Sequence, residues 1–551
     1  MGYTMKHYTP LTADALSEAL TLLPDLTAPT RKNFLKLESR IGRWLSSTRA
    51  KLTDDPAEYK AFLRVFTNKR LDARQLSTFQ CGRIYERCAK RCAGRDIIAL
   101  CDTCEFSLTN LAGRTTARDA KQLGVLSDNK TAGLKLHCIL CLERESMRPL
   151  GVAHAFVYAS PKTVETSAQR RDTPFAQRQS ARWIDSIHSA LRHSVHTAQR
   201  VTFIADAEAD QFNMLAGLFN TTSARDQTHD ALSTQKCQAT RPEVRWCFRL
   251  ATDRIVRNPE LGYWNKDQVT VSQYLNERCA EHNDHRVSVG LAASGSRKQR
   301  TVRLRIRSCR MSLRRPSGGG VCKGDKHYRG RAIPRCADVY VTIAEQLDRQ
   351  GQGCGRMTSR QRERYHRAAA NRGHSAPIHW ALATNYEVGS EAEQLEALEL
   401  YSKRWVIELF FRMLKSDGLD MERNASRRVD RWILVLLLGM DRALTAEKLV
   451  AMRDAEDRSG FEEFSAEQRE VLEADDYARC HPRGDRAGKV YVSQNKQRKG
   501  SASWFAVQVA IMAGYMGNKK SPPGRKLMAE GLKLLEERVR ALRFQKLYEQ
   551  K

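Results

Sequence analysis

Two short apolar segments that each end in an aspartate place the strongest constraint on the fold. They are Asp96–Asp102 and Val201–Asp206, and each has the length and composition of one buried β-strand. Between them lie two more apolar runs joined by a charged turn, which indicates a hairpin, and then a segment with helical periodicity. The expected elements in chain order are a strand (96–102), a hairpin (134–143 and 150–159), a helix (176–197), a strand (201–206) and a helix (about 207–219).

This order of elements is typical of an RNase H-like α/β core. The core resumes with an expected strand at Pro377–Thr384 and an apolar helix after residue 400. The predicted fold class is therefore α/β, an RNase H-like catalytic core interrupted by a basic β-rich insertion, with helical N-terminal and C-terminal domains. The expected domains are residues 1–92, which include a basic helix near 31–52, a catalytic domain at 93–440 with the insertion at about 222–376, and residues 441–551.

The charge of the chain predicts a polyanionic partner. The 551 residues contain 93 Lys and Arg against 63 Asp and Glu, a formal net charge of +30. Nucleic acid is the polyanion that best fits this surplus, and a membrane surface is the competing one. No run of about 18 apolar residues occurs, and the first ten residues have no signal-peptide core, so we expect a cytoplasmic protein without a membrane partner.

The segment 401–415 combines an apolar helix with a polar stripe. Tyr401, Arg404, Glu408 and Lys415 stand at offsets 0, 3, 7 and 14, which fall within about 60° on one continuous helix. A carboxylate for a divalent cation, two cations for phosphate and a phenol for positioning fit phosphodiester chemistry. The alternative is a solvated helix face with ion pairs one turn apart.

Three carboxylates are expected to converge in this core. Asp102 and Asp206 end two strands that should lie side by side, and Glu408 comes from a helix packed beside them. Such carboxylates repel one another unless divalent cations lie between them. We therefore predict that Asp102, Asp206 and Glu408 are catalytic residues that bind two Mg²⁺ ions, for which Mn²⁺ could substitute.

A basic stretch of the insertion is a candidate DNA-binding surface. Residues 297–331 contain thirteen Lys and Arg and one acid. Within it Arg303, Arg305 and Arg307 share one face of an alternating strand, with apolar residues on the other. A solvated face would mix charge signs, so we interpret this one as facing DNA.

The spacing Tyr-x2-Arg-x3-Glu-x6-Lys at 401–415 resembles the motif of the bacterial DDE transposases of the insertion-sequence-four type, the group that includes the hairpin-forming cut-and-paste enzyme of transposon five. Asp102-Thr103 is similar to the first Asp-Thr element of that family, although Cys104 stands where a second Thr is common. Asp206-Ala-Glu208-Ala-Asp210 matches its Asp-x-Glu-x-Asp element. The similarity is strong at these motifs, moderate at both termini and weak at 345–375, where this chain carries extra basic residues.

The resemblance implies a DNA transposase that binds inverted-repeat ends and target DNA as a homodimer in the bacterial nucleoid. It further implies Mg²⁺-dependent cleavage, hairpin formation and strand transfer. Trp380 matches the tryptophan that stacks on a flipped base, although Trp380 taken alone is better explained as a core residue. Arg249 falls where the insertion of that family contributes DNA contacts. Residues 1–92 resemble its helical N-terminal DNA-end-binding domain, and the C-terminal helices resemble the region through which two copies of such an enzyme pair.

Two alternatives to this function stay open. One is a catalytically silent regulator derived from a transposase, against which the three intact acids argue. The other is a different RNase H-like nuclease such as a resolvase, against which the basic insertion and the 401–415 motif argue.

Several other residues have simpler interpretations. The pairs Cys101-x2-Cys104 and Cys138-x2-Cys141 could suggest a zinc ribbon, but residues three apart on a strand point to opposite faces, so buried thiols are favoured over zinc. Asp128 is expected in a turn rather than at the active site. His137 and His379 are expected to be structural, and Glu208 and Asp210 to meet a helix N-terminus, with a supporting role at the metal as the alternative.

Overall fold

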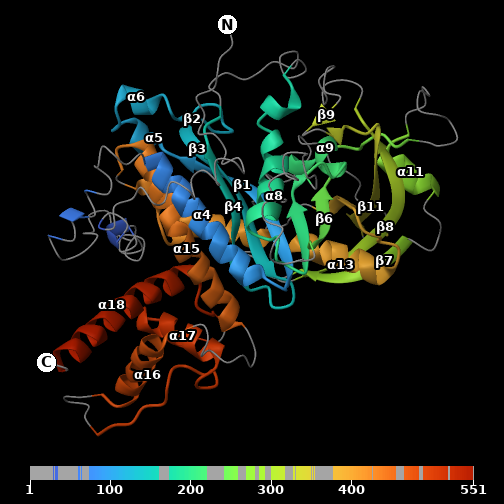
Figure 1. The fold of residues 1–551 in the computed structure, drawn as a ribbon. Helices are drawn as coiled ribbons and strands as arrows, with labels where there is room; N and C mark the ends of the chain where they lie inside the picture. Colours follow the sequence, from blue (N-terminus) through green and yellow to red (C-terminus); the bar gives the residue numbers. More distant parts are fainter. Residues whose placement is uncertain are drawn as a thin grey trace, which may run out of the picture.

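The computed structural model describes most of the chain from residue 73 onwards. The described residues are 73–160, 173–219, 241–257, 269–278, 284–291, 300–316, 327–328, 331–348, 350–351, 353, 377–424, 426–454, 464–482, 488–518 and 521–549, with short pieces at 29, 32–34, 57, 60–61 and 64. Most of the expected N-terminal domain and of the basic segment 345–375 lies outside them. The described part is a mixed α/β structure in which helices cover a large sheet (Figure 1).

Among the described residues, the central sheet has ten strands, and nine of them follow the order β2-β3-β1-β5-β6-β12-β11-β8-β7, with β4 paired to β3. Their bounds are β1 Asp96–Ser107, β2 Gly124–Val125, β3 Ala132–Glu143, β4 Pro149–Tyr158, β5 Arg200–Ala205, β6 Glu243–Arg249, β7 Asp284–Leu291, β8 Arg300–Arg314, β11 Cys336–Gln346 and β12 His379–Thr384. A separate ribbon pairs β9 (His327–Tyr328) with β10 (Arg331–Ala332). The predicted α/β class and the β3–β4 hairpin agree with this sheet, which is compatible with an RNase H-like core.

The strand that carries Asp102 is longer than the sequence suggests. We expected Asp102 to end it, but β1 continues to Ser107, so Asp102 lies mid-strand. The reason is the antiparallel partner β3, whose backbone pairs with β1 from Ile97 to Ser107, well beyond the apolar run. Asp206 does follow its strand directly, because β5 ends at Ala205.

The expected insertion at about 222–376 is not separate from the core sheet. Its first strand, β6, pairs in parallel with β5 and antiparallel with β12, so it belongs to the centre of the sheet. The later strands β11, β8 and β7 extend the same sheet beyond β12. The region is β-rich, as predicted, but its strands continue the core because β12 leaves an open edge that β11 covers.

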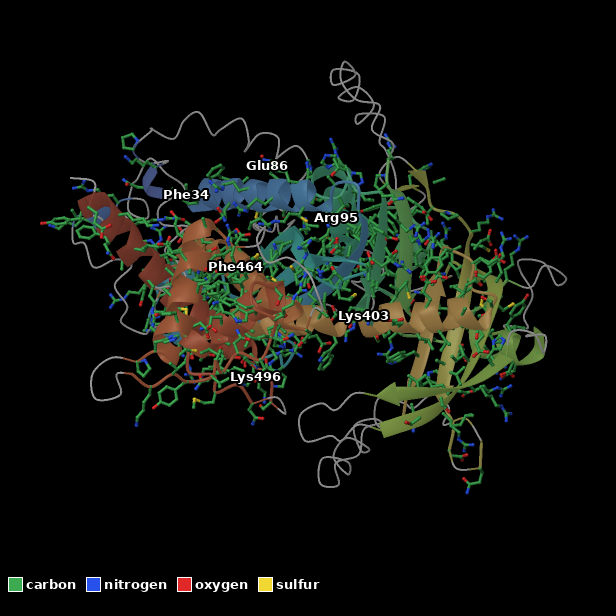
Figure 2. The ribbon with its side chains drawn as sticks, turned by 90° about the horizontal axis from the view of Figure 1, so that it is seen from below. Phe34, Glu86, Arg95, Lys403, Phe464 and Lys496 are labelled. Atoms are coloured by element: carbon green, nitrogen blue, oxygen red, sulfur yellow. The ribbon has the colours of Figure 1, made fainter. Side chains whose placement is uncertain are left out.

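Helices cover both faces of the sheet. On one side α8 (Ala181–His193) packs on β3 and β4, near α9 (Phe212–Leu215). On the other side α13 (Glu391–Ser402) packs on β5, β6 and β8, while α14 (Trp405–Arg412) packs on β1. Viewed from below, the helical segment around Lys403 runs across the strands (Figure 2). Shorter helices are α5 (Thr109–Ala112), α6 (Ala117–Ala120) and α11 (Val271–Arg278), and 3-10 turns lie at 175–177, 207–209 and 421–423.

The expected boundaries at 92/93 and 440/441 do not separate the helices from the sheet. Helix α4 (Ala73–Cys92) lies against β4 and against α15. Helix α15 (Val429–Arg453) runs through residue 441 and reaches the terminal helices α16 (Ala466–Cys480), α17 (Ala502–Met512) and α18 (Arg525–Glu549), which gather at one end of the molecule (Figure 1). Its almost continuous apolar surface explains this, because α15 is buried between both groups. None of the described helices is both long and apolar enough to cross a membrane.

Candidate functional site

Strand register brings the two predicted aspartates together. β1 and β5 run parallel, and their pairing continues from Asp96–Arg200 to Cys101–Ala205. The next residues on the two strands are Asp102 and Asp206, which therefore lie level at the same edge of the parallel pair. The side chain of Asp206 then caps the following helical turn, where its Oδ1 accepts a hydrogen bond from Glu208 N at 2.9 Å.

Glu408 faces the same place from the helix layer. It lies in the first turn of α14, which packs on β1. Arg404 links it to the sheet, because its guanidinium donates to Asp102 Oδ2 at 2.9 Å and also to Glu408. Tertiary packing thus brings Asp102, Asp206 and Glu408 to one site, as predicted, with Arg404 between two of them.

The electrostatics of this site show an excess of buried negative charge. The pKa of Asp102 is raised to about 7, first by burial and then by the charge of Asp206, while Arg404 opposes the rise. The pKa of Arg404 is raised above its usual value, because the attraction of Asp102, Tyr401 and Glu408 outweighs its own burial. A cation is needed here for the carboxylates to ionise together, and Arg404 supplies one positive charge.

The chemistry of the donor set fits a divalent metal, although the carboxylates are not gathered tightly. Carboxylate oxygens are the ligands that Mg²⁺ prefers. Of the residues that the structure describes, however, the three acids do not form a group whose oxygens all lie within 4.8 Å of one another. Arg404 lies between Asp102 and Glu408 and contacts both carboxylates.

The motif helix expected at 401–415 is broken in two places. Helix α13 ends at Ser402, α14 covers only Trp405–Arg412, and Met413–Asp417 form a π-helical turn. The side chain of Arg404, at this interruption, contacts Asp102 on β1 and Glu408 one turn further along the chain. Lys415 lies in the π-helical turn and approaches Glu422, at 4.0 Å, rather than the three acids.

An aromatic and basic group adjoins the acids. Tyr401 is buried, and its hydroxyl is hydrogen-bonded to Arg249, the last residue of β6. Trp380 meets the Tyr401 ring edge-on, with centroids 5.1 Å apart. Trp380 is the second residue of β12, and it remains partly exposed. Sequence reasoning thus named Trp380, Tyr401 and Arg249 separately, and the structure places them together.

The acids after Asp206 have partners of their own. Asp210 forms a buried ion pair with Arg254 at 2.6 Å and accepts hydrogen bonds from the backbone of Ala251 and Thr252. Asp210 therefore fixes the loop after β6. Glu208 is more exposed and lies 3.3 Å from Arg182, and burial together with Asp206 raises its pKa.

The arginine face of β8 is only partly open. Val302, Leu304 and Ile306 are buried on the opposite face, as the alternation predicts. Arg303 is exposed, and its guanidinium donates to the carbonyl of Asp348 at 2.7 Å. Arg305 pairs with Asp284 on β7, and Arg307 is buried against Glu345 on β11 at 2.8 Å. The prediction of one open face is wrong for Arg307, because neighbouring strands supply acids that sequence spacing does not reveal.

The simpler interpretations of Asp128 and His137 are confirmed. Asp128 closes a turn by accepting hydrogen bonds from the backbone of Lys130 and Thr131. His137 is fully buried and hydrogen-bonded through both ring nitrogens, to Thr103 at 3.0 Å and to Ser186 at 2.9 Å. Thr103 N also donates to Asp102 Oδ1 at 2.7 Å. Ser186 and His137 therefore hold Thr103 in place, and Thr103 in turn contacts Asp102. In the sequence, only the Asp-Thr pair indicated this arrangement.

Comparison with known protein families bears on this site. Residues 183–438 match the model of the transposase DDE domain family. The matched transposase domain is slightly less than half of the chain, and it contains Asp206 and Glu408 but begins after Asp102. The match supports a DDE transposase family, a transposase function in general and DNA as the substrate. Enzymes of the DDE class generally use divalent metal ions, which agrees with the carboxylate set described above.

Proposed function

We propose that the chain is a DNA transposase of the insertion-sequence-four type. It would bind the inverted-repeat ends of a mobile element and act by cut-and-paste, with strand cleavage, hairpin formation and strand transfer. The observation that carries this proposal is the β1–β5 register, which sets Asp102 level with Asp206 while Arg404 holds Glu408 against the same site. The transposase domain match at residues 183–438 supports it independently.

Asp102, Asp206 and Glu408 are the residues that would hold the metal. Two Mg²⁺ ions at such a set activate an attacking oxygen and stabilise a leaving oxygen of the phosphodiester. The burial of Asp102 within the sheet fixes that carboxylate, and the attachment of Asp206 to the turn at 207–209 fixes the second. Arg404 neutralises the acids before DNA arrives and is then free to bind a phosphate.

Trp380, Tyr401 and Arg249 form the DNA-gripping group beside this metal site. The partly exposed Trp380 would stack on a base that leaves the helix when the DNA end bends, and Tyr401 supports the ring from its edge. Arg249 and Arg404 would contact the adjacent phosphates, and Lys415 and Arg303 more distant ones. Inverted-repeat DNA, target DNA and a second copy of the chain are the proposed partners.

A cleavage assay tests the proposal directly. The DNA that flanks the gene supplies candidate terminal repeats, and the full-length protein is incubated with labelled ends and Mg²⁺. Asp102→Asn, Asp206→Asn and Glu408→Gln should each abolish nicking while end binding, measured by gel shift, persists, because binding depends on basic residues elsewhere. Asp128→Asn is the matched control, since this acid lies in a surface turn.

The other outcomes separate the alternatives. Binding of ends without nicking by the wild-type protein would indicate a silent regulator. Cleavage of branched DNA in preference to repeat ends would indicate a resolvase-like nuclease. Mg²⁺-dependent nicking by Asp206→Asn or by either of the other variants would remove that residue from the proposed site.

A further inference from the structure

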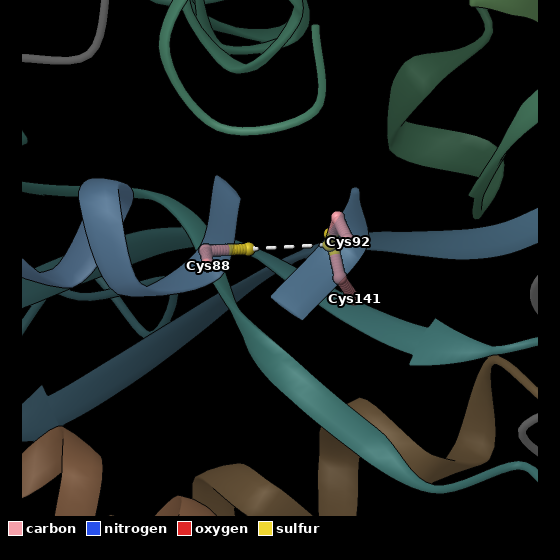
Figure 3. A group of neighbouring side chains, drawn as sticks. All are labelled: Cys88, Cys92 and Cys141. Atoms are coloured by element: carbon pink, nitrogen blue, oxygen red, sulfur yellow. Dashed lines mark hydrogen bonds between the residues drawn. The ribbon is translucent and has the colours of Figure 1, made fainter. Parts of the chain in front are cut away.

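Three cysteines from two elements converge behind the active-site sheet. Cys88 and Cys92 are one helical turn apart on α4, and Cys141 lies on β3 beneath them (Figure 3). Their sulfur atoms all lie within 4.8 Å of one another, and the Sγ atoms of Cys88 and Cys92 are 3.7 Å apart. All three side chains are fully buried. Sequence spacing did not reveal this group, because it pairs a helix with a distant strand.

The close approach of α4 to the sheet depends on a glycine. Gly151 on β4 pairs directly with Cys141 in the β3–β4 ladder. A Cβ atom at this position would lie 2.8 Å from the Cβ of Cys88, a separation that packed side chains do not adopt. The absence of a side chain at Gly151 therefore allows α4 to pack close to β3, with Cys88 and Cys92 near Cys141.

We infer that Cys88, Cys92 and Cys141 form a binding site for one thiophilic metal ion, Cu(I) or Zn²⁺, held by three thiolates. Thiolate sulfur is the ligand that selects these ions. With metal–sulfur bonds of about 2.3 Å, three sulfurs around one ion lie about 4.0 Å apart at most. The observed separations are close to that triangle before any ion is bound.

The surroundings of the cluster favour a thiolate at Cys92, whereas hydrogen bonds to the Cys92 sulfur and burial raise the pKa values of Cys88 and Cys141. Those two thiols need a bound cation in order to ionise. The pKa of Cys92 is lowered, chiefly because Cys141 and Cys88 donate S–H hydrogen bonds to its sulfur, and the guanidinium groups of Arg95 and Arg91 add to the effect. A buried thiolate of this kind needs a cation close by. Arg91 is fixed beside the cluster by its bond to the carbonyl of Leu150. These two arginines offset part of the charge that three thiolates bring.

Simple packing of buried thiols is the competing explanation, since cysteine is common in protein cores. Packing alone does not require three sulfurs to meet. Other buried cysteines of the described part, such as Cys81 and Cys247, join no such group. A bound ion would link α4 to β3, and β3 also pairs with β1, the strand that carries Asp102.

The test uses the full-length protein made in cells supplied with zinc or, separately, with copper, because a buried ion enters as the chain folds. Metal content is measured after gel filtration under reducing, oxygen-free conditions. Wild-type protein should retain one equivalent of zinc or copper, and X-ray absorption should show three sulfur neighbours at about 2.3 Å. Removal by a strong chelator should lower the melting temperature.

Variants assign the ion to this cluster rather than to the carboxylates. Cys92→Ser and Cys141→Ser should each lose the ion and its sulfur signal, whereas Cys81→Ser, on the same helix, should keep both. Far-ultraviolet circular dichroism checks that the variants fold. Wild-type protein that retains neither ion, or that binds one without sulfur neighbours, would overturn the inference, as would unchanged metal content in the folded Cys92→Ser and Cys141→Ser variants.

Discussion

At the scale of single residues, Arg404 connects the acids of the site. It reaches Asp102 on the sheet and Glu408 on the next helical turn, and its position between them is the one a cation should take in the absence of metal. Removing it leaves two carboxylates without a counter-charge, whereas a metal ion could replace it. The stability of the site therefore depends on whether Arg404 or a metal ion balances the negative charge of the acids.

We predict that Arg404→Ala lowers the free energy of unfolding by about 1–3 kcal/mol in metal-free buffer, the usual cost of leaving partly buried polar groups unsatisfied. Addition of Mn²⁺ should recover more stability in the variant than in the wild type, because the ion replaces the lost charge. Thermal melting with and without Mn²⁺ measures both effects. Arg423→Ala, an exposed arginine nearby, is the control, and equal metal responses in the two variants would contradict the idea.

A second prediction concerns Trp380. Trp380→Ala should still produce the first nick but accumulate nicked ends with little hairpin, because a flipped base loses a stacking platform worth about 1–3 kcal/mol. Trp380→Phe retains an aromatic face and should recover part of the hairpin. Gel analysis of reaction intermediates gives the ratio. A parental ratio of hairpin to nicked product in Trp380→Ala would leave this residue with a packing role only.

At the scale of elements, strand β8 shows how one alternating pattern gives residues different roles. Its arginines share a face, but β7 and β11 place Asp284 and Glu345 against two of them. Charge density along a strand therefore overstates the surface that is open to DNA. The exposed Arg303 and the buried Arg307 allow the two roles to be separated by experiment.

We predict opposite effects for these two arginines. Arg303→Gln should weaken DNA binding and reduce the log–log salt slope by up to about 0.9, the value for one lost phosphate contact. Arg307→Gln should leave the slope unchanged and destabilise the fold by about 3–5 kcal/mol, because Glu345 would keep a buried, unpaired charge. Fluorescence anisotropy across a salt series and urea unfolding give the two readouts. A smaller salt slope of DNA binding in Arg307→Gln would show that Arg307 contacts DNA, as the sequence pattern first indicated.

At the scale of the whole molecule, α15 joins the central sheet to the terminal helices. α18, at the far end, presents large exposed apolar side chains, Phe544 and Tyr548. Exposed aromatic residues at a chain end are a common basis for association. The proposed pairing of two copies at the synapsed DNA ends could use this part of α18.

We predict that Phe544→Ser combined with Tyr548→Ser reduces dimer formation on DNA ends by at least about tenfold, the change expected for a loss of about 1.4 kcal/mol. Single-end binding should be unchanged, because the DNA-gripping group lies on β6, β12 and α13 rather than on α18. Light scattering of the DNA complexes measures the stoichiometry. Tyr477→Ser, an equally exposed residue on α16, is the control. An undiminished paired complex in the double variant would exclude this face of α18.

The sequence alone determined those features that depend on local pattern. The apolar strands, the β3–β4 hairpin and the acids Asp102, Asp206 and Glu408 follow from periodicity and from a recognisable spacing of residues. The resemblance at 401–415 also led to the transposase function that the family match supports in general. The strands and the hairpin are confirmed, because each rests on residues that are close together in the chain, while the catalytic role of the acids stays a prediction.

Only the tertiary structure decided what depends on partners distant in the chain. Strand pairing carried β1 past Asp102 and joined the insertion to the core sheet. Packing of α14 on β1 brings Arg404 to Asp102. Contacts between distant segments also place acids opposite Arg305 and Arg307. They bring Cys141 to Cys88 and Cys92 in the same manner. Sequence periodicity describes which face a residue occupies, whereas its neighbours are set by register and packing between distant segments.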